Sequence, residues 1–263
     1  MLGLFRAKPP IDRDEYDWML AVFAWLVQVL DADGVSRHGR TVLATTDFFP
    51  RSTLTGHDRA VELFEQVRAL AGMADWPCRV VAGESARGFE LGGAAGTLIR
   101  HEGGPAAGTF GHDGNEILIT YEPSAVERPA ELVATFAHEL AHYLLHAHPG
   151  LPPGGADLEE HATDLTAVFL GFGVFMANGA KNFGQWQGEE GSGWQMRRQG
   201  YLSEEALTAA LAIFVRMTGE DAGAAEAGLK DYLRAPFRQT LKLLDREMPD
   251  VRAGLEGLDW GSW

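Results

Sequence analysis

The feature of this sequence that most constrains its fold is an apolar segment bounded by two prolines, Pro129 and Pro149. Proline is tolerated in the first turn of a helix but not in its interior, so the sequence predicts one helix that begins near Pro129 and ends before Pro149. The helix carries His138 and His142. With about 3.6 residues per turn, histidines four positions apart lie about 40° apart on one face. Both imidazoles can therefore reach one metal ion.

Glu139 lies about 100° around this helix from His138. This is too far for the two side chains to bind the same ion comfortably, but close enough for the carboxylate to contact a water molecule on the ion. Zinc lowers the pKa of a bound water to about 7, and an adjacent carboxylate can take its proton as the water attacks a carbonyl. Glu139 is therefore the predicted general base.

A catalytic zinc site normally has three protein ligands and one open position, so a third ligand must come from another segment. Glu160 and Asp164 are four positions apart on the next predicted helix and face the same way. One carboxylate can bind the metal, and the other can accept the free ring N–H of a ligand histidine, a role for which Asp164 is placed. Glu159 stays an alternative to Glu160, because the sequence does not define where this helix starts.

The two motifs resemble those of a known family. Residues 135–144 resemble the extended zinc-binding consensus of the zincin metallopeptidases, including its uncharged flanking positions. Residues 160–164 are similar to the E-x-x-x-D of the gluzincin branch, in which the glutamate binds zinc and the aspartate contacts a ligand histidine. The separation of about 18 residues between His142 and Glu160 is also similar. The likeness covers about 45 residues, from residue 117 to residue 164.

The resemblance implies an α+β, zincin-like fold with a small twisted sheet, the motif helix beneath it, a Glu-bearing second helix and a helical C-terminal part. It implies a zinc-dependent metallohydrolase that hydrolyses peptide bonds. Zn2+ would be bound by His138, His142 and Glu160, with Glu139 as base and Asp164 in support. It also implies that the strand at 117–121 forms the upper rim of the substrate cleft. The sequence offers no assured counterpart of the tyrosine or histidine that stabilises the oxyanion in thermolysin-like members.

His148 is a competing third ligand, because it lies ten residues after His138, as in the HExxHxxGxxH pattern of the metzincins. That pattern needs a glycine at the position of Leu145 to turn the chain. A helix that continues would place His148 about 15 Å along the axis from His138. The gluzincin arrangement is therefore preferred.

Two other functions stay open on the sequence: a zinc-stabilised scaffold or regulatory binding protein without turnover, and a hydrolase of a non-peptide amide. Glu139 favours an enzyme, since a structural zinc site has no need for a general base and usually fills all four positions with protein ligands.

The bulk composition limits the partners and the location that we expect. The net charge of −15 is unfavourable for binding nucleic acid phosphates. A single cysteine, Cys78, allows neither an intrachain disulfide nor a cysteine-type zinc site. The apolar runs at 18–30 and 165–177 are shorter than the roughly 20 residues of a membrane span. The N-terminal stretch is too short in apolar residues for a signal peptide, so a cytoplasmic protein is expected. The oligomeric state cannot be derived.

The 263 residues are expected to form a single domain. It would comprise an N-terminal α+β part (1–128), the metal-binding helices (129–177), and a Gly-rich loop with C-terminal helices (178–263). Within it the sequence predicts helices at 14–30, 56–71, 158–177, 224–233, 237–247 and after Ser203, strands at 41–45 and 79–82, a hairpin at 109–121, and a loop at 178–200.

Overall fold

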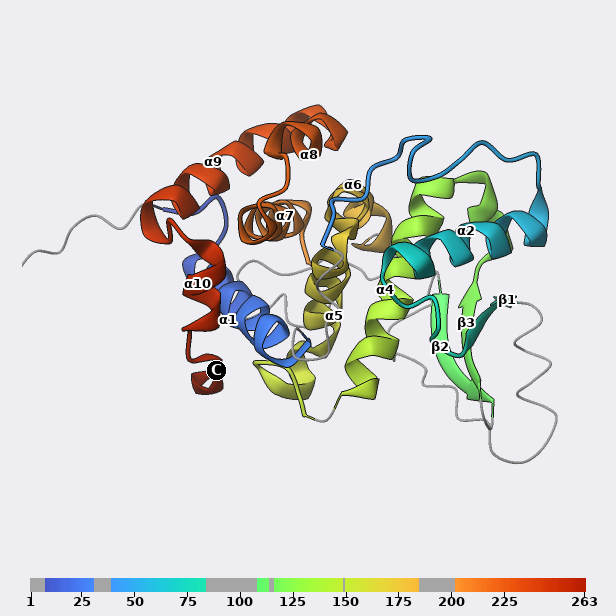
Figure 1. Cartoon of the computed structure of the whole chain (residues 1–263), viewed down its shortest axis with the longest axis horizontal. Coiled ribbons are helices and arrows are strands. Elements are labelled where there is room, and N and C mark those ends of the chain that lie inside the picture. Colours follow the sequence, from blue (N-terminus) through green and yellow to red (C-terminus); the bar gives the residue numbers. More distant parts are fainter. Residues whose placement is uncertain (1–7, 31–38, 84–107, 114–115, 149, 185–201) are drawn as a thin grey trace, which may run out of the picture.

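The computed structural model of the chain describes residues 8–30, 39–83, 108–113, 116–148, 150–184 and 202–263 (Figure 1). Helices dominate this part of the chain, and one small sheet accompanies them, so the predicted α+β class is confirmed. The strands are β1 (Cys78–Ala82), β2 (Gly108–Asp113) and β3 (Glu116–Tyr121). The helical elements are α1 (Arg13–Leu30), α2 (Gly56–Leu70), η3 (Pro123–Glu127), α4 (Pro129–Ala147), η4 (Gly155–Leu158), α5 (Glu159–Ala167), η5 (Val168–Phe172), α6 (Gly173–Gly184), α7 (Glu204–Thr218), α8 (Ala222–Gly228), α9 (Asp231–Glu247), α10 (Val251–Glu256) and η7 (Trp260–Ser262).

The sheet has the strand order β1-β3-β2. β1 pairs with β3 in parallel, with Val80 opposite Ile119, and β2 pairs with β3 antiparallel, with Asp113 opposite Glu116. The predicted hairpin is thus present, while its turn at 114–115 lies outside the described residues. The strand predicted at 117–121 is the central strand of the sheet. The edge strand beside α4 is β2.

Helix α4 packs between α2 and the sheet. Phe136, near its centre, is fully buried and meets the ring of Phe64 on α2 edge-on, with 5.3 Å between the ring centroids. The same ring lies 6.0 Å from that of Tyr121, the last residue of β3. Helix α2 turns an apolar face to α4, because its buried residues recur every three or four positions: Ala60, Leu63, Phe64 and Val67. These aromatic contacts fix the helix that carries both motif histidines.

Gly171 bends the long apolar helix that was predicted at 158–177. The helix divides into α5, the single π-helical turn η5 and α6, and Gly171 has a φ of 102°, which glycine adopts far more readily than other residues. A Cβ at this position would lie 2.3 Å from the backbone oxygen of Arg40. The N–H of Val42 donates to the Gly171 carbonyl at 2.9 Å. The bend therefore lets the chain at residues 40–42 cross directly over the helix.

The strand predicted at 41–45 is wrong, because this segment is irregular in the structure. Its backbone N–H groups donate to acceptors in or beside helices, and not to a neighbouring strand. The N–H of Thr41 donates to the carboxylate of Glu220, just after α7, at 2.9 Å, and the N–H of Val42 donates to Gly171.

Two predicted boundaries also differ. Helix α6 continues to Gly184, so residues 178–184 of the expected loop are helical, and residues 185–200 lie outside the described part of the chain. The last long helices separate at Leu229 and Lys230, and Pro236 lies inside α9. By contrast, the predicted N-cap at Ser203 is confirmed, since its side chain accepts the N–H of Ala206.

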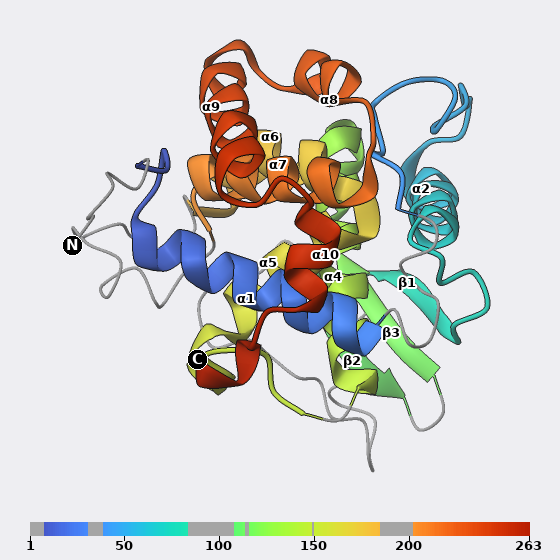
Figure 2. The same ribbon diagram turned by 60° about the vertical axis from the view of Figure 1, so that its left-hand side comes forward.

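The remaining helices pack on the far side of α5 from the sheet, as Figures 1 and 2 show. Helix α1 is buried along most of its length. Near its start, Trp18 donates from its indole N–H to the Pro153 carbonyl at 2.9 Å, just before α5. Near its end, Gln28 binds the Leu255 carbonyl of α10 at 3.2 Å and accepts from the Trp260 indole at 2.8 Å. Helix α1 thus joins the start of α5 to the C-terminal helices.

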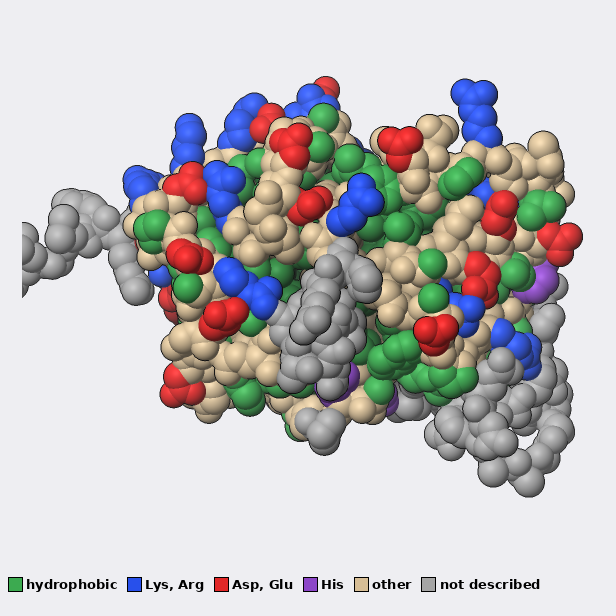
Figure 3. All heavy atoms as spheres, in the orientation of Figure 1, with side chains coloured by type: hydrophobic (Ala, Val, Ile, Leu, Met, Phe, Trp, Pro, Cys, Tyr) green, Lys and Arg blue, Asp and Glu red, His purple; other side chains and the backbone are tan. Residues whose placement is uncertain are grey.

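The continuous helical run Gly155–Ala180 is long and apolar enough to cross a membrane by length and composition, but 94% of its apolar window is buried inside the protein. Acidic and basic side chains are interspersed on the face drawn in Figure 3, and apolar atoms are visible between them. Among the residues described on that face, the excess negative charge does not gather into one patch.

We expect Gly171→Ala to lower the free energy of unfolding by about 3 kcal/mol or more, because it adds a clash with the Arg40 backbone to the cost of a positive φ. The matched control is Gly219→Ala at the end of α7, where φ is 75° and a Cβ would meet nothing within 4 Å. That change should cost only about 1–2 kcal/mol. Urea unfolding measures both, and equal losses would contradict a role for the close crossing.

Candidate metal centre

His138 and His142 lie on the face of α4 that is turned toward α5. Both are buried, with exposed fractions of 4% and 0%. Their rings are nearly perpendicular, at 86°, and their Nε2 atoms lie 3.0 Å apart. The helix that was predicted between the two prolines forms over Pro129–Ala147, so the spacing of four residues brings the two rings together as expected.

Glu160 comes from the first turn of α5 and completes a group of three possible metal ligands. Its Oε2 atom lies 3.5 Å from the Nε2 of His138 and 3.5 Å from the Nε2 of His142. The Glu160 side chain is one-third exposed, whereas the two histidines are buried. The group is therefore open to solvent on the side of the carboxylate.

These separations match what a metal ion requires. Ligand atoms placed tetrahedrally at about 2.0–2.1 Å from an ion are about 3.3–3.4 Å apart. The three observed distances, 3.0, 3.5 and 3.5 Å, lie on either side of this value. His138, His142 and Glu160 can therefore hold one metal ion with little movement.

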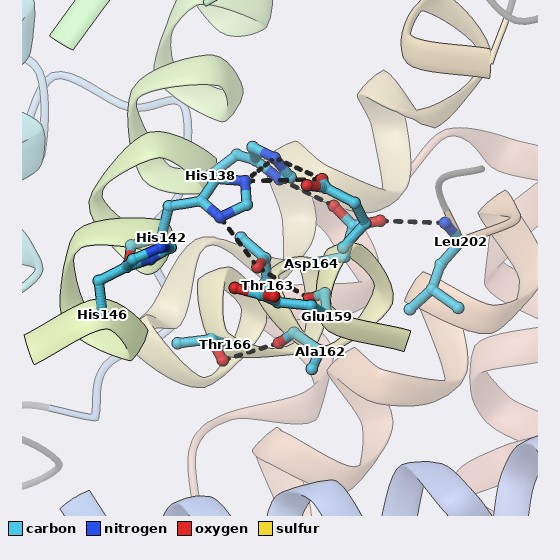
Figure 4. A network of polar contacts seen from close by, with 10 residues as sticks. His138, His142, His146, Glu159, Ala162, Thr163, Asp164, Thr166 and Leu202 are labelled. Atoms are coloured by element: carbon cyan, nitrogen blue, oxygen red, sulfur yellow. Dashed lines mark hydrogen bonds and ion pairs between the residues drawn. The ribbon is translucent and has the colours of Figure 1, made fainter. Parts of the chain in front are cut away.

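Asp164 holds the ring of His138 from behind. Its Oδ1 atom lies 3.0 Å from Nδ1 of His138, and its Oδ2 accepts the backbone N–H of Leu202 at 3.0 Å (Figure 4). The aspartate is 1% exposed, so both contacts are shielded from water. With Nδ1–H donated to Asp164, the lone pair on Nε2 of His138 is directed at the metal position.

Thr163, which was not predicted as a site residue from the sequence, lies behind the second histidine. Its hydroxyl is 3.3 Å from Nδ1 of His142 and donates to the backbone carbonyl of Glu159 at 2.9 Å (Figure 4). A signal was present in the sequence, because Glu160, Thr163 and Asp164 have the i, i+3, i+4 spacing that places three side chains on one helix face.

The charges around His138 favour its protonated form while no metal is bound. Burial lowers the pKa of His138, but hydrogen bonds to Asp164 and Glu160 and the nearby charges of Asp164 and Glu139 outweigh burial and raise it to about 10. A protonated His138 donates from Nδ1 to Asp164 and from Nε2 to Nε2 of His142. A metal ion held by His138, His142 and Glu160 would take the place of that shared proton.

Glu139 follows His138 on α4 and is 4% exposed. Its negative charge contributes to raising the pKa of His138, so the carboxylate lies close to the ligand group. It is not one of the three grouped ligands among the described residues. This agrees with its position about 100° around the helix from His138.

The competing residues lie elsewhere. Helix α4 continues through Leu145 and His148 follows its last residue, with Nδ1 at 3.1 Å from the Leu144 carbonyl. Glu159 contributes its backbone carbonyl to Thr163, and the ligand group found in the described part of the chain contains Glu160 and not Glu159. The alternatives left open by the sequence are thus separated by geometry.

Comparisons of this chain with protein-family models, with curated proteins and with solved structures found no match. The metal centre accordingly stands on the geometry of its own residues.

Proposed function

We propose that this protein is a zinc metallohydrolase of the gluzincin type that hydrolyses peptide bonds. The observation that carries the proposal is the convergence of His138, His142 and Glu160, whose ligand atoms lie 3.0–3.5 Å apart, with Glu139 next in sequence to the first ligand. The support that Asp164 gives to His138 is the arrangement that the gluzincin resemblance implies.

Zinc suits this set of donors. Two imidazole nitrogens and one carboxylate oxygen form a common catalytic zinc site, and hard cations such as magnesium prefer oxygen ligands alone. When bound, zinc supplies a Lewis acid that makes water acidic enough to be deprotonated near neutral pH. The described part of the chain groups three ligands, the number typical of a catalytic zinc site, whereas a structural zinc site normally has four protein ligands. This favours an enzyme over a scaffold.

Glu139 performs the proton transfers in this proposal. It accepts the proton of the attacking water while the water oxygen bonds to the carbonyl carbon, and then gives a proton to the amine as the C–N bond breaks. Its burial keeps the carboxylate away from bulk water. Asp164 holds the His138 ring in place throughout, because its other oxygen is anchored on the Leu202 backbone.

A peptide substrate fits the sheet beside the site. β2 lies at an edge of the sheet in the described part of the chain and packs against α4. An extended peptide can add to such an edge through main-chain hydrogen bonds and would then run alongside the helix that carries Glu139. Hydrolysis of a non-peptide amide is the alternative, and a mixed peptide library separates the two.

Glu139→Gln should retain zinc and the fold but lower peptide hydrolysis by about 10² or more, because the amide cannot accept the proton of water. The matched control is Glu159→Gln, another glutamate of the same region that lies outside the ligand group. Cleavage of a mixed peptide library and zinc content of the purified variants measure the effect. Full activity in Glu139→Gln would refute the mechanism.

Glu160→Ala should severely weaken zinc binding, since it removes the only anionic ligand of the group. Glu159→Ala and His148→Ala should bind zinc in near-normal stoichiometry, because neither side chain belongs to the group. Asp164→Ala should reduce the affinity roughly 10- to 100-fold by releasing the His138 ring. Zinc content after dialysis decides this. Loss of zinc in His148→Ala with retention in Glu160→Ala would point to a metzincin-like site.

Zinc uptake at pH 8 should release about one proton, because the pKa of His138 is raised to about 10 and zinc needs its Nε2 deprotonated. The sign is that of a raised pKa: the charge of His138 stabilises the metal-free fold fully below about pH 6.5, and this contribution is lost as the pH rises through about 10. Zinc affinity should increase from pH 6.5 to 8, because protons compete less with zinc for Nε2 of His138 as the pH rises. An indicator dye in weak buffer measures the protons. The Asp164→Asn variant should release fewer protons on zinc uptake. Zinc uptake without any proton release would contradict the role of His138 as a ligand.

A further inference from the structure

We infer that Thr163 is a positioning residue of this site, which fixes the tautomer and the orientation of His142 through its hydroxyl group. The inference rests on the zinc centre of the proposed function and adds a residue that neither the HExxH nor the E-x-x-x-D pattern contains.

The Thr163 hydroxyl has two polar contacts, and its bond to the Glu159 carbonyl decides which way the contact with His142 runs. Its single hydroxyl proton goes to the Glu159 carbonyl, at 2.9 Å, so toward His142 the oxygen can only accept. The contact at 3.3 Å therefore requires a proton on Nδ1 of His142. In a neutral imidazole this leaves Nε2 as the free acceptor, and Nε2 is the atom that faces His138 and Glu160.

The contact between Thr163 and His142 is buried. The side chain of His142 is fully buried, and so is Thr163, so water does not compete for the Nδ1–H. A buried ring N–H without an acceptor is costly, and the hydroxyl removes that cost for only one tautomer. The two histidines are thus supported differently: an anion lies behind His138, and a neutral hydroxyl lies behind His142.

The hydrogen bond also connects the ligands to one another. Thr163 is bonded to the carbonyl of the residue before Glu160, so the orientation of the His142 ring is tied to the backbone that carries the third ligand. Thr163 and Asp164 contact His142 and His138 of α4, respectively (Figure 4). Glu160, from the same face of α5, lies 3.5 Å from the Nε2 atoms of both histidines.

The experiment compares Thr163→Val with Thr163→Ser and with Thr166→Val. Valine has nearly the shape of threonine without its hydroxyl, and serine keeps the hydroxyl. Thr166 is the matched control, because it lies on the same helix, is fully buried, and also donates to the carbonyl four residues earlier. That hydrogen bond runs to Ala162, at 2.7 Å, and not to a histidine. Thr163→Val should weaken zinc binding about 10- to 100-fold, as measured by competition with a chelator. Thr163→Ser and Thr166→Val should stay within about threefold of the wild type.

Nitrogen-15 NMR of the histidine rings gives a second measurement that needs no zinc. In metal-free wild-type protein, His142 should carry its proton on Nδ1, in slow exchange with water, and Thr163→Val should lose that protection while Thr166→Val keeps it. If the wild type binds no zinc, the proposed function fails, and this signal still tests the hydrogen bond. A proton on Nε2 of His142 in neutral form, or equal losses of affinity in Thr163→Val and Thr166→Val, would overturn the inference.

Discussion

The packing of α5 against the histidine face of α4 is the contact on which the rest of this structure depends. From one face, α5 provides a carboxylate between the two rings and a hydrogen-bond acceptor behind each of them. Every one of these contacts joins groups at 3.0–3.5 Å. A small rotation or slide of either helix would break several together. The other elements serve to hold these two helices in register.

Each helix of the pair is also held by contacts with other elements of the fold. Phe136 fixes α4 against α2 and the sheet, and the indole of Trp18 fixes the chain that leads into α5. Gly171 then ends the straight course of α5, which lets α6 diverge and lets residues 40–42 cross the bend. Rigid, dry surroundings of this kind limit the reorganisation that metal binding would require.

The electrostatics of the site explain why it is suited to a cation. Two buried carboxylates, Glu139 and Asp164, and the partly exposed Glu160 surround two imidazoles. Buried anions are costly without a compensating positive charge, and in the metal-free protein the proton on His138 provides part of it. A divalent ion at the same point compensates more charge and satisfies both Nε2 atoms. The negative surroundings thus favour metal binding, while the open side at Glu160 leaves room for a further ligand.

The sequence by itself determined the local parts of this protein. The prolines at 129 and 149 delimited α4, and the four-residue spacings placed each pair of side chains on one face of its helix, because helical geometry depends only on neighbours in the chain. The strand at 79–82, the hairpin at 109–121 and the N-cap at Ser203 were predictable because they also follow from residues that are neighbours in the chain. The strand expected at 41–45 failed because its backbone hydrogen bonds go to Gly171 and Glu220, which are distant in sequence. Only the tertiary structure grouped Glu160, rather than Glu159 or His148, with the two histidines, put β3 in the centre of the sheet, and brought Thr163 to His142. Each of those outcomes depends on how two separate elements are rotated against each other, and side-chain packing across the whole core sets that rotation.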